Sequence, residues 1–299
     1  MLSRRRFLRH SSAVAAVSSV LPSLLSWRGS ADGFSALRGG VGVFTRRGGT
    51  IGWLATDEAL VVVDTQYPKT APDCWSGLQD RGTPPLDLVI NTHHHGDHVG
   101  GNGVFAQHSD RLLAHANVPG LMRAAADEED SVGTVPTETF EETWTESVGD
   151  ERLTLRHYGP AHTGGDSVVF FENANVVHMG DLVFNRAYPF IDVDGGADST
   201  RWIQILETVH GELGDDTIVI HGHGNPEYGI HGGRDDLLVM RDFLSALNDY
   251  VVQRRQAGAS LEEMKQTKVL DGFEAFDFDW GLSLADCIEA VYRERTREG

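Results

Sequence analysis

The chain has 299 residues, 40% of them hydrophobic and 23% charged, which is enough to build a substantial core in one large or two small domains. Its formal net charge of −19 would repel a phosphate backbone, so we expect a small-molecule substrate and no nucleic-acid partner. Cys74 and Cys287 are too few for a disulfide scaffold; we expect two buried thiols, with a disulfide as the alternative.

The N-terminus has the pattern of an export signal. Ser3–Arg9 reads SRRRFLR, and a mostly apolar run, Ala13–Trp27, follows it. That run is shorter than the roughly 20 apolar residues of a membrane-spanning helix. The paired arginines before Phe-Leu resemble a twin-arginine translocation signal. We therefore assign residues 1–33 to export through the twin-arginine translocon, into the periplasm or the exterior or onto a membrane tether, and residues 34–299 to the folded domain.

The first half of the mature chain mixes strand and helix patterns. Residues 127–147 are acidic and threonine-rich, which favours an exposed loop. Gly48-Gly49 and Asp57-Glu58 have the composition of hairpin turns. Helices are predicted at Thr70–Gln79 and Val118–Ala126. Strands are predicted at Val41–Thr45, Thr50–Ala55, Ala59–Asp64, Leu86–Asn91 and Arg111–His115.

The second half begins with strands and ends with helices. Residues 185–199 are rich in Gly, Asp and Pro and are predicted to form a long loop. Strands are predicted at Arg152–His157, Ser167–Phe171, Asn175–Met179 and Thr217–Ile220. Helices are predicted at Thr200–Leu213, Leu237–Arg254, Leu261–Lys268 and Leu282–Glu298. Two groups of strands with helices between and after them predict an α/β fold in which two mixed β-sheets pack face to face, with helices outside, in one domain.

A histidine-rich segment directly follows the predicted strand Leu86–Asn91. It reads Thr92-His93-His94-His95-Gly96-Asp97-His98. Alternate side chains of an extended backbone point the same way, so His93 and His95 can share one metal ion. The glycine lets the chain turn, which aims Asp97 and His98 at a second position. Imidazole and carboxylate are ligands that suit zinc or iron.

Three further candidate ligands stand apart from this segment, each next to the end of a predicted strand: His162, Asp181 and His223. Taken alone, each has an ordinary structural interpretation, and Asp181 for example could cap a helix. Their common position at strand ends lets them converge on one site, as loop residues at a sheet edge do. We therefore place them with the histidine-rich segment.

Five separated motifs, in this order, resemble those of the metallo-β-lactamase superfamily: Val63-Asp64, Thr92–His98, Ala161-His162-Thr163-Gly164-Gly165-Asp166-Ser167, Gly180-Asp181 and Gly222-His223-Gly224. The resemblance implies an αββα sandwich with its site at one edge of the two sheets. It also implies two ligand sets bridged by Asp181: His93, His95 and His162 for the first metal, and Asp97, His98 and His223 for the second.

The resemblance assigns one further residue and leaves one open. Asp64 would lie behind the ligands and hold the histidine loop. The family usually has proline where this chain has His221, which we interpret as a tolerated substitution; an additional hydrogen-bond donor is the alternative. We interpret the remaining histidines as structural or surface residues: His94, His108, His115, His157, His178, His210 and His231.

Such a centre implies two zinc ions, with iron as the alternative, and a hydroxide available at neutral pH. The hydroxide would attack the carbonyl carbon of an ester, thioester, lactone or lactam, and Asp97 would be catalytic as well as a ligand. The chain shows no Ser–His–Asp arrangement with a nucleophile-elbow sequence. The alternatives are an iron-dependent enzyme like the persulfide dioxygenases, a β-lactamase, and a binding module that has lost catalysis.

Local details narrow the substrate by exclusion. Metallo-β-lactamases with a cysteine ligand carry Cys and then a carboxylate-binding Lys near the position of Asp181, where this chain continues Leu182-Val183-Phe184. This difference argues against penicillin hydrolysis. The bridging aspartate resembles that of hydroxyacylglutathione hydrolases and acyl-homoserine lactonases. However, the lactonases have Tyr at about Phe184, and glutathione thioesters are mainly cytoplasmic.

Two regions outside the motifs complete the prediction. The loop Asn185–Ser199 is expected to border the cleft through Arg186, Tyr188 and Phe190 and to set selectivity. The helices from Leu237 onward either cap the cleft or form a dimer interface. The oligomeric state stays open.

Overall fold

The computed structural model describes residues 33–126 and 133–297. All of the predicted export signal except Gly33 therefore lies outside the described residues. Within the described ranges, no helix combines the length and the apolar character needed to cross a membrane.

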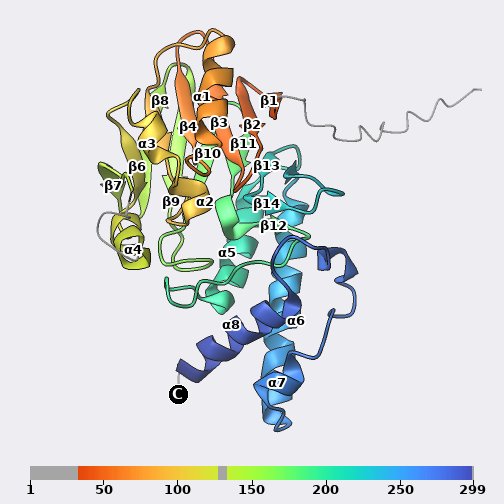
Figure 1. The fold of residues 1–299 in the computed structure, drawn as a ribbon. Helices are drawn as coiled ribbons and strands as arrows, with labels where there is room; N and C mark the ends of the chain where they lie inside the picture. The colour runs from red at the N-terminus through yellow and green to blue at the C-terminus, as the bar shows by residue number, and fades with distance from the viewer. Residues whose placement is uncertain (1–32, 127–132, 298–299) are drawn as a thin grey trace, which may run out of the picture.

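Among the described residues, seven strands form the first sheet in chain order (Figure 1). The first four strands run antiparallel to one another in sequence, and the last four, beginning with the fourth, are parallel to one another. The strands are β1 (Phe34–Arg38), β2 (Val41–Phe44), β3 (Ile51–Ala55), β4 (Leu60–Val63), β5 (Leu88–Ile90), β6 (Leu112–His115) and β7 (Glu138–Phe140). The helices of this half are α1 (Ala71–Asp80), α2 (Gly96–Val99), α3 (Asn102–Phe105) and α4 (Val118–Ala125).

The second sheet contains six strands of the described chain, in the order β15-β13-β11-β10-β9-β8. Its members are β8 (Thr143–Val148), β9 (Glu151–Arg156), β10 (Val168–Phe171), β11 (Val176–His178), β13 (Ile218–Ile220) and β15 (His231–Gly232). A short parallel pair, β12 (Phe184–Asn185) and β14 (His223–Gly224), lies apart from both sheets. The remaining elements are η2 (Gly180–Leu182), α5 (Ser199–Glu212), α6 (Asp235–Gln256), α7 (Leu261–Met264), η3 (Glu274–Phe276) and α8 (Leu284–Arg297).

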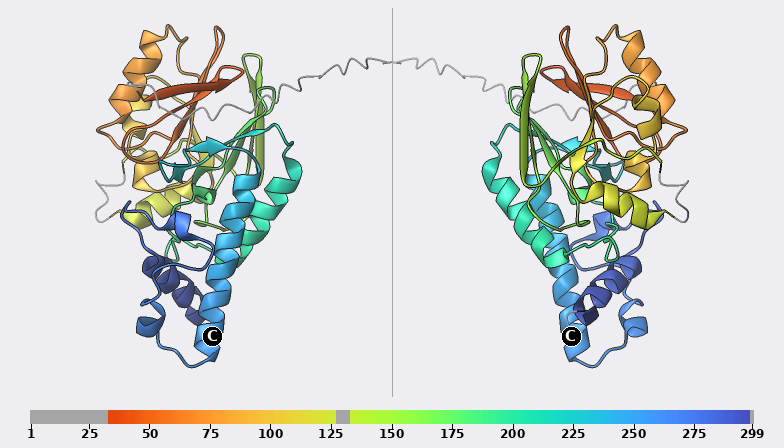
Figure 2. Two further views of the ribbon diagram at one scale, coloured as in Figure 1. Left: turned by 90° about the vertical axis from the view of Figure 1, so that its right-hand side faces the viewer. Right: turned by 90° about the vertical axis from the view of Figure 1, so that its left-hand side faces the viewer.

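The layering follows from strands that are apolar on both faces. Along β4, Val61 and Val63 pack into the cluster shared by the two sheets, whereas Leu60 and Val62 pack with residues of α1 and α3. The second sheet buries its other face against α5, α6 and α8. The result is the predicted αββα sandwich, with helices on both outer faces (Figure 2).

The prediction for residues 127–147 is wrong where the structure describes them. Residues 127–132 lie outside the described residues, but 138–140 form β7 and 143–147 form most of β8. These two strands are edge strands of their sheets. Two of the acidic residues that suggested a loop are paired instead: Glu138 and Glu146 both receive hydrogen bonds from Arg111, at 2.7–3.0 Å. An edge strand with one solvated face accepts such residues.

The two cysteines are free and buried in different parts of the core. Cys74 lies on α1, in the cluster outside the first sheet, and Cys287 lies on α8, in the cluster outside the second. The expectation of two buried thiols is confirmed.

The C-terminal helices pack against the long loop that precedes α5. The Cys287 thiol donates to the carbonyl of Pro189 at 3.3 Å, and Glu294 accepts a hydrogen bond from the backbone N–H of Ser199 at 3.0 Å. Helices α7 and α8 lie beside α6, beyond the end of the two sheets (Figures 1 and 2). The segment between η3 and α8 contains Trp280, whose ring lies 5.3 Å from that of His223.

Candidate metal centre

Four loops at one edge of the sandwich bring the predicted ligands together. His93 and His95 follow β5, and Asp97 and His98 lie in α2. The other three come from the second sheet: His162 lies between β9 and β10, Asp181 in η2 after β11, and His223 in β14 after β13. The seven residues form two groups, and within each group the ligand atoms all lie within 4.8 Å of one another.

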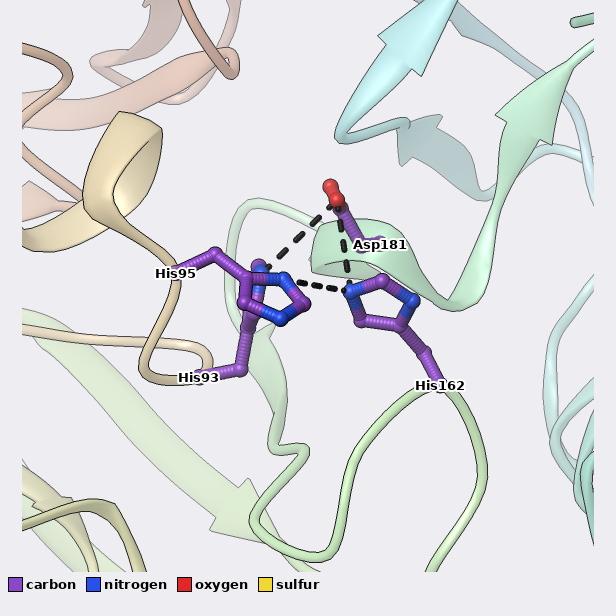
Figure 3. Close-up of side chains that lie close together, drawn as sticks. All are labelled: His93, His95, His162 and Asp181. Carbon is purple, nitrogen blue, oxygen red and sulfur yellow. Dashed lines mark hydrogen bonds and ion pairs between the residues drawn. The ribbon is translucent and has the colours of Figure 1, made fainter. Parts of the chain in front are cut away.

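The first group consists of His93, His95, His162 and Asp181 (Figure 3). The Oδ2 atom of Asp181 lies 3.7 Å from His93 Nε2 and 3.5 Å from His162 Nε2. The Nδ1 atom of His95 lies 3.0 Å from His162 Nε2. Three imidazoles and one carboxylate thus surround one point, which is a donor set typical of zinc.

The second group consists of Asp97, His98 and His223. His223 Nε2 lies 3.2 Å from Asp97 Oδ2 and 3.3 Å from His98 Nε2. Asp181 reaches this group as well, because its Oδ1 lies 3.0 Å from His98 Nε2 and its Oδ2 lies 3.4 Å from His223 Nε2. The Asp181 carboxylate therefore contacts both groups.

Hydrogen bonds behind the histidines fix which nitrogen faces inward. His162 Nδ1 donates to the carbonyl of Phe190 at 2.7 Å. His98 Nδ1 donates to Asp64 Oδ2 at 2.8 Å, and the hydroxyl of Thr92 donates to the same carboxylate oxygen at 2.8 Å. The Thr92 hydroxyl oxygen is then left to accept from His93 Nδ1, at 2.9 Å. Since a neutral imidazole carries one N–H, His93 and His162 present bare Nε2 atoms to the site.

The two groups fit a metal ion because one predicted ligand atom has no hydrogen-bond partner among the described residues. His93 Nε2 is buried and makes no hydrogen bond within the described chain, although a buried polar atom ordinarily has one. Asp64, Asp97 and Asp181 also place three carboxylates around the second group. A divalent cation bound here would give the buried His93 nitrogen a partner. It would also balance the negative charge of the three carboxylates.

The protonation of the second group follows from the same carboxylates. Burial alone would lower the pKa of His98, but Asp181, Asp97 and Asp64 outweigh it and raise that pKa well above its ordinary value. Burial is likewise outweighed at His223, where Asp181 and Asp97 raise the pKa to about 9. The site therefore favours positive charge at these two rings, as it would favour a cation bound in place of the protons.

Two glycines leave room for these side chains. A Cβ at Gly222 would overlap Asp181 Oδ1, and a Cβ at Gly49 would overlap the ring of His98. The backbone therefore lies directly against the ligands on two sides. Glycine at these positions is required by close approach.

Aromatic rings surround the two groups. Phe184 stacks on His223 with ring centroids 5.3 Å apart, and the Trp280 ring lies 5.3 Å from His223. Phe190 lies 5.3 Å from the ring of His95 and is 46% exposed. Tyr67, 37% exposed, approaches the second group, since it and Asp97 both contact the position of a Cβ at Gly48.

The prediction for the loop Asn185–Ser199 is partly wrong. Phe190 borders the centre as expected, but Tyr188 is 1% exposed and packs against Phe243 and Phe276 in the core. An aromatic residue in a Gly- and Asp-rich segment suggested a surface position, yet the loop is anchored by burying this ring. Arg186 pairs with Asp236 at 2.9 Å.

The sequence did not reveal the role of Asp192, whereas His94 is a buried structural residue, one of the two interpretations given above. Asp192 Oδ2 lies 3.0 Å from His95 Nε2 and 3.3 Å from His94 Nε2. The Asp192 side chain is one of several acidic residues in a loop, and no spacing marks it. His221 is fully buried, and its Nε2 lies 3.4 Å from Asp236 Oδ2 on α6, which is not a predicted ligand.

The family model described as the metallo-beta-lactamase superfamily matches residues 44–291 of this chain. Among curated proteins, the α subunit of 2,4-dinitroanisole O-demethylase from Nocardioides sp. (strain JS1661) is 31% identical over 132 residues, which cover 43% of this chain and 39% of that protein. Metallo-beta-lactamase IND-1 from Chryseobacterium indologenes is 23% identical over 180 residues, covering 60% of this chain and 73% of that protein. The match thus spans well under half of the demethylase subunit.

Solved structures share the architecture at low sequence identity. The sec-alkylsulfatase Pisa1 from Pseudomonas sp. superposes with a TM-score of 0.67 and 17% identity, over 88% of this chain and 50% of that chain. A metallo-beta-lactamase from Pontibacter korlensis superposes with a TM-score of 0.58 and 18% identity, over 71% of this chain and 98% of that chain. These similarities establish the fold.

Proposed function

The chain belongs to the metallo-β-lactamase superfamily of metal-dependent hydrolases, and from this premise we propose that it is a zinc hydrolase acting on a carboxylic ester, thioester, lactone or lactam. The observation that carries the proposal is the Asp181 carboxylate, which lies within 3.7 Å of imidazole nitrogens from both ligand groups. His93, His95 and His162 would hold one ion, Asp97, His98 and His223 the other, and Asp181 both.

The chain's own contribution to this chemistry is orientation and burial. When bound, two divalent ions would supply a water whose pKa is lowered toward about 7 and would polarise the substrate carbonyl. His93, His98 and His162 are held from behind by hydrogen bonds, so the site is preorganised. Asp181 is 4% exposed, which keeps its charge away from bulk water.

The exposed aromatic rings beside the two ligand groups support a substrate with an apolar or flat group next to its carbonyl. Three large hydrophobic side chains of the described residues are exposed, and two of them, Tyr67 and Phe190, flank the two ligand groups. Phe190 lies beside the first group and Tyr67 beside the second. Apolar and aromatic surfaces on both sides of a polar centre are a common arrangement in small-molecule sites.

Elemental mass spectrometry of the purified protein tests the proposal directly. Zinc near two per chain supports it, and a panel of esters, thioesters, lactones and β-lactams would then identify the substrate class. Iron near one per chain would replace it with a dioxygenase, because imidazole and carboxylate also accept iron. No bound metal after reconstitution would overturn it.

A matched pair of variants sharpens the test. Asp181→Ala should lose metal, whereas Asp215→Ala, at an exposed aspartate paired with Arg234, should keep it.

We also propose that residues 1–33 direct export through the twin-arginine pathway, which carries folded proteins and would deliver this enzyme to the periplasm or beyond. Cell fractionation tests this proposal. Replacing both Arg4 and Arg5 with Lys should leave the protein in the cytoplasm. Unchanged export of that variant would contradict the proposal.

A further inference from the structure

We propose that Asp192 is a positioning residue for the first metal position: its carboxylate fixes His95 in the one tautomer that presents Nδ1 to the other ligands. The inference rests on the proposed two-metal centre and adds to it a residue outside the predicted ligand set. Asp192 would act through His95 and would not itself contact the ion.

The two nitrogens of His95 face opposite ways. Nδ1 lies 3.0 Å from His162 Nε2, inside the first ligand group. Nε2 lies 3.0 Å from Asp192 Oδ2. An ionised carboxylate only accepts hydrogen bonds, so Nε2 carries the proton and Nδ1 is bare. Without that acceptor, both tautomers and a rotated ring would compete, and Nδ1 cannot bind a cation while it carries the proton.

Asp192 is itself firmly held. Its Oδ1 accepts a hydrogen bond from the backbone N–H of Gly195 at 2.8 Å, and His94 Nε2 lies 3.3 Å from its Oδ2. A carboxylate immobilised by these contacts is what orienting an imidazole requires.

The same loop supports a second ligand of the first group. The Phe190 carbonyl accepts from His162 Nδ1 at 2.7 Å, and the Asp192 backbone N–H donates to the carbonyl of His162 at 3.2 Å. His98 of the second group, by contrast, is held by Asp64. Loss of Asp192 should therefore weaken one metal position and spare the other.

A competing explanation is that Asp192 is a ligand. His94, His95 and Asp192 lie close enough together to hold an ion of their own. Such an ion would need His95 Nε2 deprotonated while Nδ1 serves the first group, so one ring would bridge two cations. The hydrogen-bond distance of 3.0 Å favours the positioning role, and the number of metals bound separates the two explanations.

The experiment compares Asp192→Ala and Asp192→Asn with Asp194→Ala, a control on the same loop that pairs with Arg293 at 2.8 Å. Zinc affinity is measured by chelator competition, and the ligand field by the absorption spectrum of the cobalt-substituted protein. We expect the Asp192 variants to bind one of two metals about 10–100-fold more weakly, with altered cobalt bands. The control should match the wild type. Asp192→Asn preserves the side-chain shape and gives the readout if the alanine variant does not fold.

Each outcome decides between the explanations. Two metals bound with unchanged affinity and an unchanged cobalt spectrum in both Asp192 variants would overturn the positioning role alone. A third metal in the wild type that is lost in Asp192→Ala would make Asp192 a ligand and also overturn it. No metal in the wild type would overturn the proposed function, and the inference with it.

Discussion

The imidazole of His98 and the carboxylate of Asp64 lie 2.8 Å apart, and both side chains are completely buried. Asp64 also accepts hydrogen bonds from the backbone N–H and the hydroxyl of Thr92, both at 2.8 Å. One carboxylate, at the end of β4, therefore fixes the start of the histidine loop and a predicted ligand within it.

Replacing Asp64 with Asn should destabilise the metal-free protein by about 3 kcal/mol, since it puts an amide donor where three donors converge and breaks a buried ion pair. Urea unfolding after chelation measures this loss. Asp87→Asn is the matched control, because Asp87 accepts from one backbone N–H at 2.9 Å and should cost about 1 kcal/mol. Equal losses in the two variants would contradict the role assigned to Asp64.

Gly222→Ala should remove metal binding and also lower stability, because a Cβ here would lie 2.7 Å from the backbone of Gly180. The same Cβ would overlap Asp181 Oδ1 and displace the carboxylate shared by both ligand groups. Hydrolysis should then fall by roughly 10²–10³-fold, as when a preorganised electrostatic group is removed. Gly211→Ala on α5, where a Cβ meets nothing within 4 Å, is the control and should retain both metals. Normal metal content in Gly222→Ala would refute this prediction.

Phe190→Ala should change relative rates across a panel of aryl and small alkyl esters while leaving the metal content near the wild-type value. The Phe190 ring lies beside His95, but His162 donates its hydrogen bond to the Phe190 backbone carbonyl, which the substitution keeps. Tyr228→Ala is the control, because that exposed ring packs against Arg186 at 4.7 Å. Parallel rate changes on all substrates would show that Phe190 does not select among them.

The stacked rings of His115 and His157, 3.8 Å apart, should make the protein sensitive to mild acid. Burial, and then His157, lowers the pKa of His115 from 6.5 to about 4. Between these values the unfolded chain takes up the proton and the folded one does not. The free energy of unfolding therefore has its full value above about pH 6.5, and it decreases as the pH falls toward 4.

His115→Asn should flatten this dependence, because Asn keeps an acceptor for the Asn117 backbone N–H but does not titrate. Urea unfolding of chelator-treated protein across this pH range provides the measurement. His108→Asn, at an exposed ring stacked on Trp75, is the control. An acid dependence of His115→Asn as steep as that of the control would disprove the assignment.

Thiol reagents should leave the folded protein unmodified. Cys74 and Cys287 are no more than 1% exposed, and burial raises the pKa of both thiols well above the ordinary range. In urea both should react, giving two labels per chain by mass spectrometry. One label or none in the unfolded, unreduced protein would indicate that these cysteines form disulfides.

Much of the centre could be predicted because chemistry and chain position coincide there. His93, His95, Asp97 and His98 are adjacent in sequence, and the apolar strand before them places them at a sheet edge. Asp192 could not be predicted, since its role exists only once the loop folds back to within 3.0 Å of His95. A single aspartate in a polar loop carries no periodicity or spacing that would distinguish it.

The errors in the fold have the same origin. Residues of β7 and β8 looked like loop because their acidic side chains gave no apolar pattern, yet Arg111 neutralises Glu138 and Glu146 across two sheets. Tyr188 looked like a surface ring because its neighbours are polar, but it packs against Phe243 on α6. In both cases the deciding partner is distant in sequence.

The shared carboxylate of Asp181 has a consequence for how the chain unfolds. His98 and His223, which meet beside it, are 125 residues apart and belong to opposite halves of the sandwich. Ions held there would act as a reversible cross-link between the halves, and closing a loop of this length permanently is worth about 5 kcal/mol in chain entropy. With metal bound, the two halves of the sandwich would then unfold together in one cooperative transition.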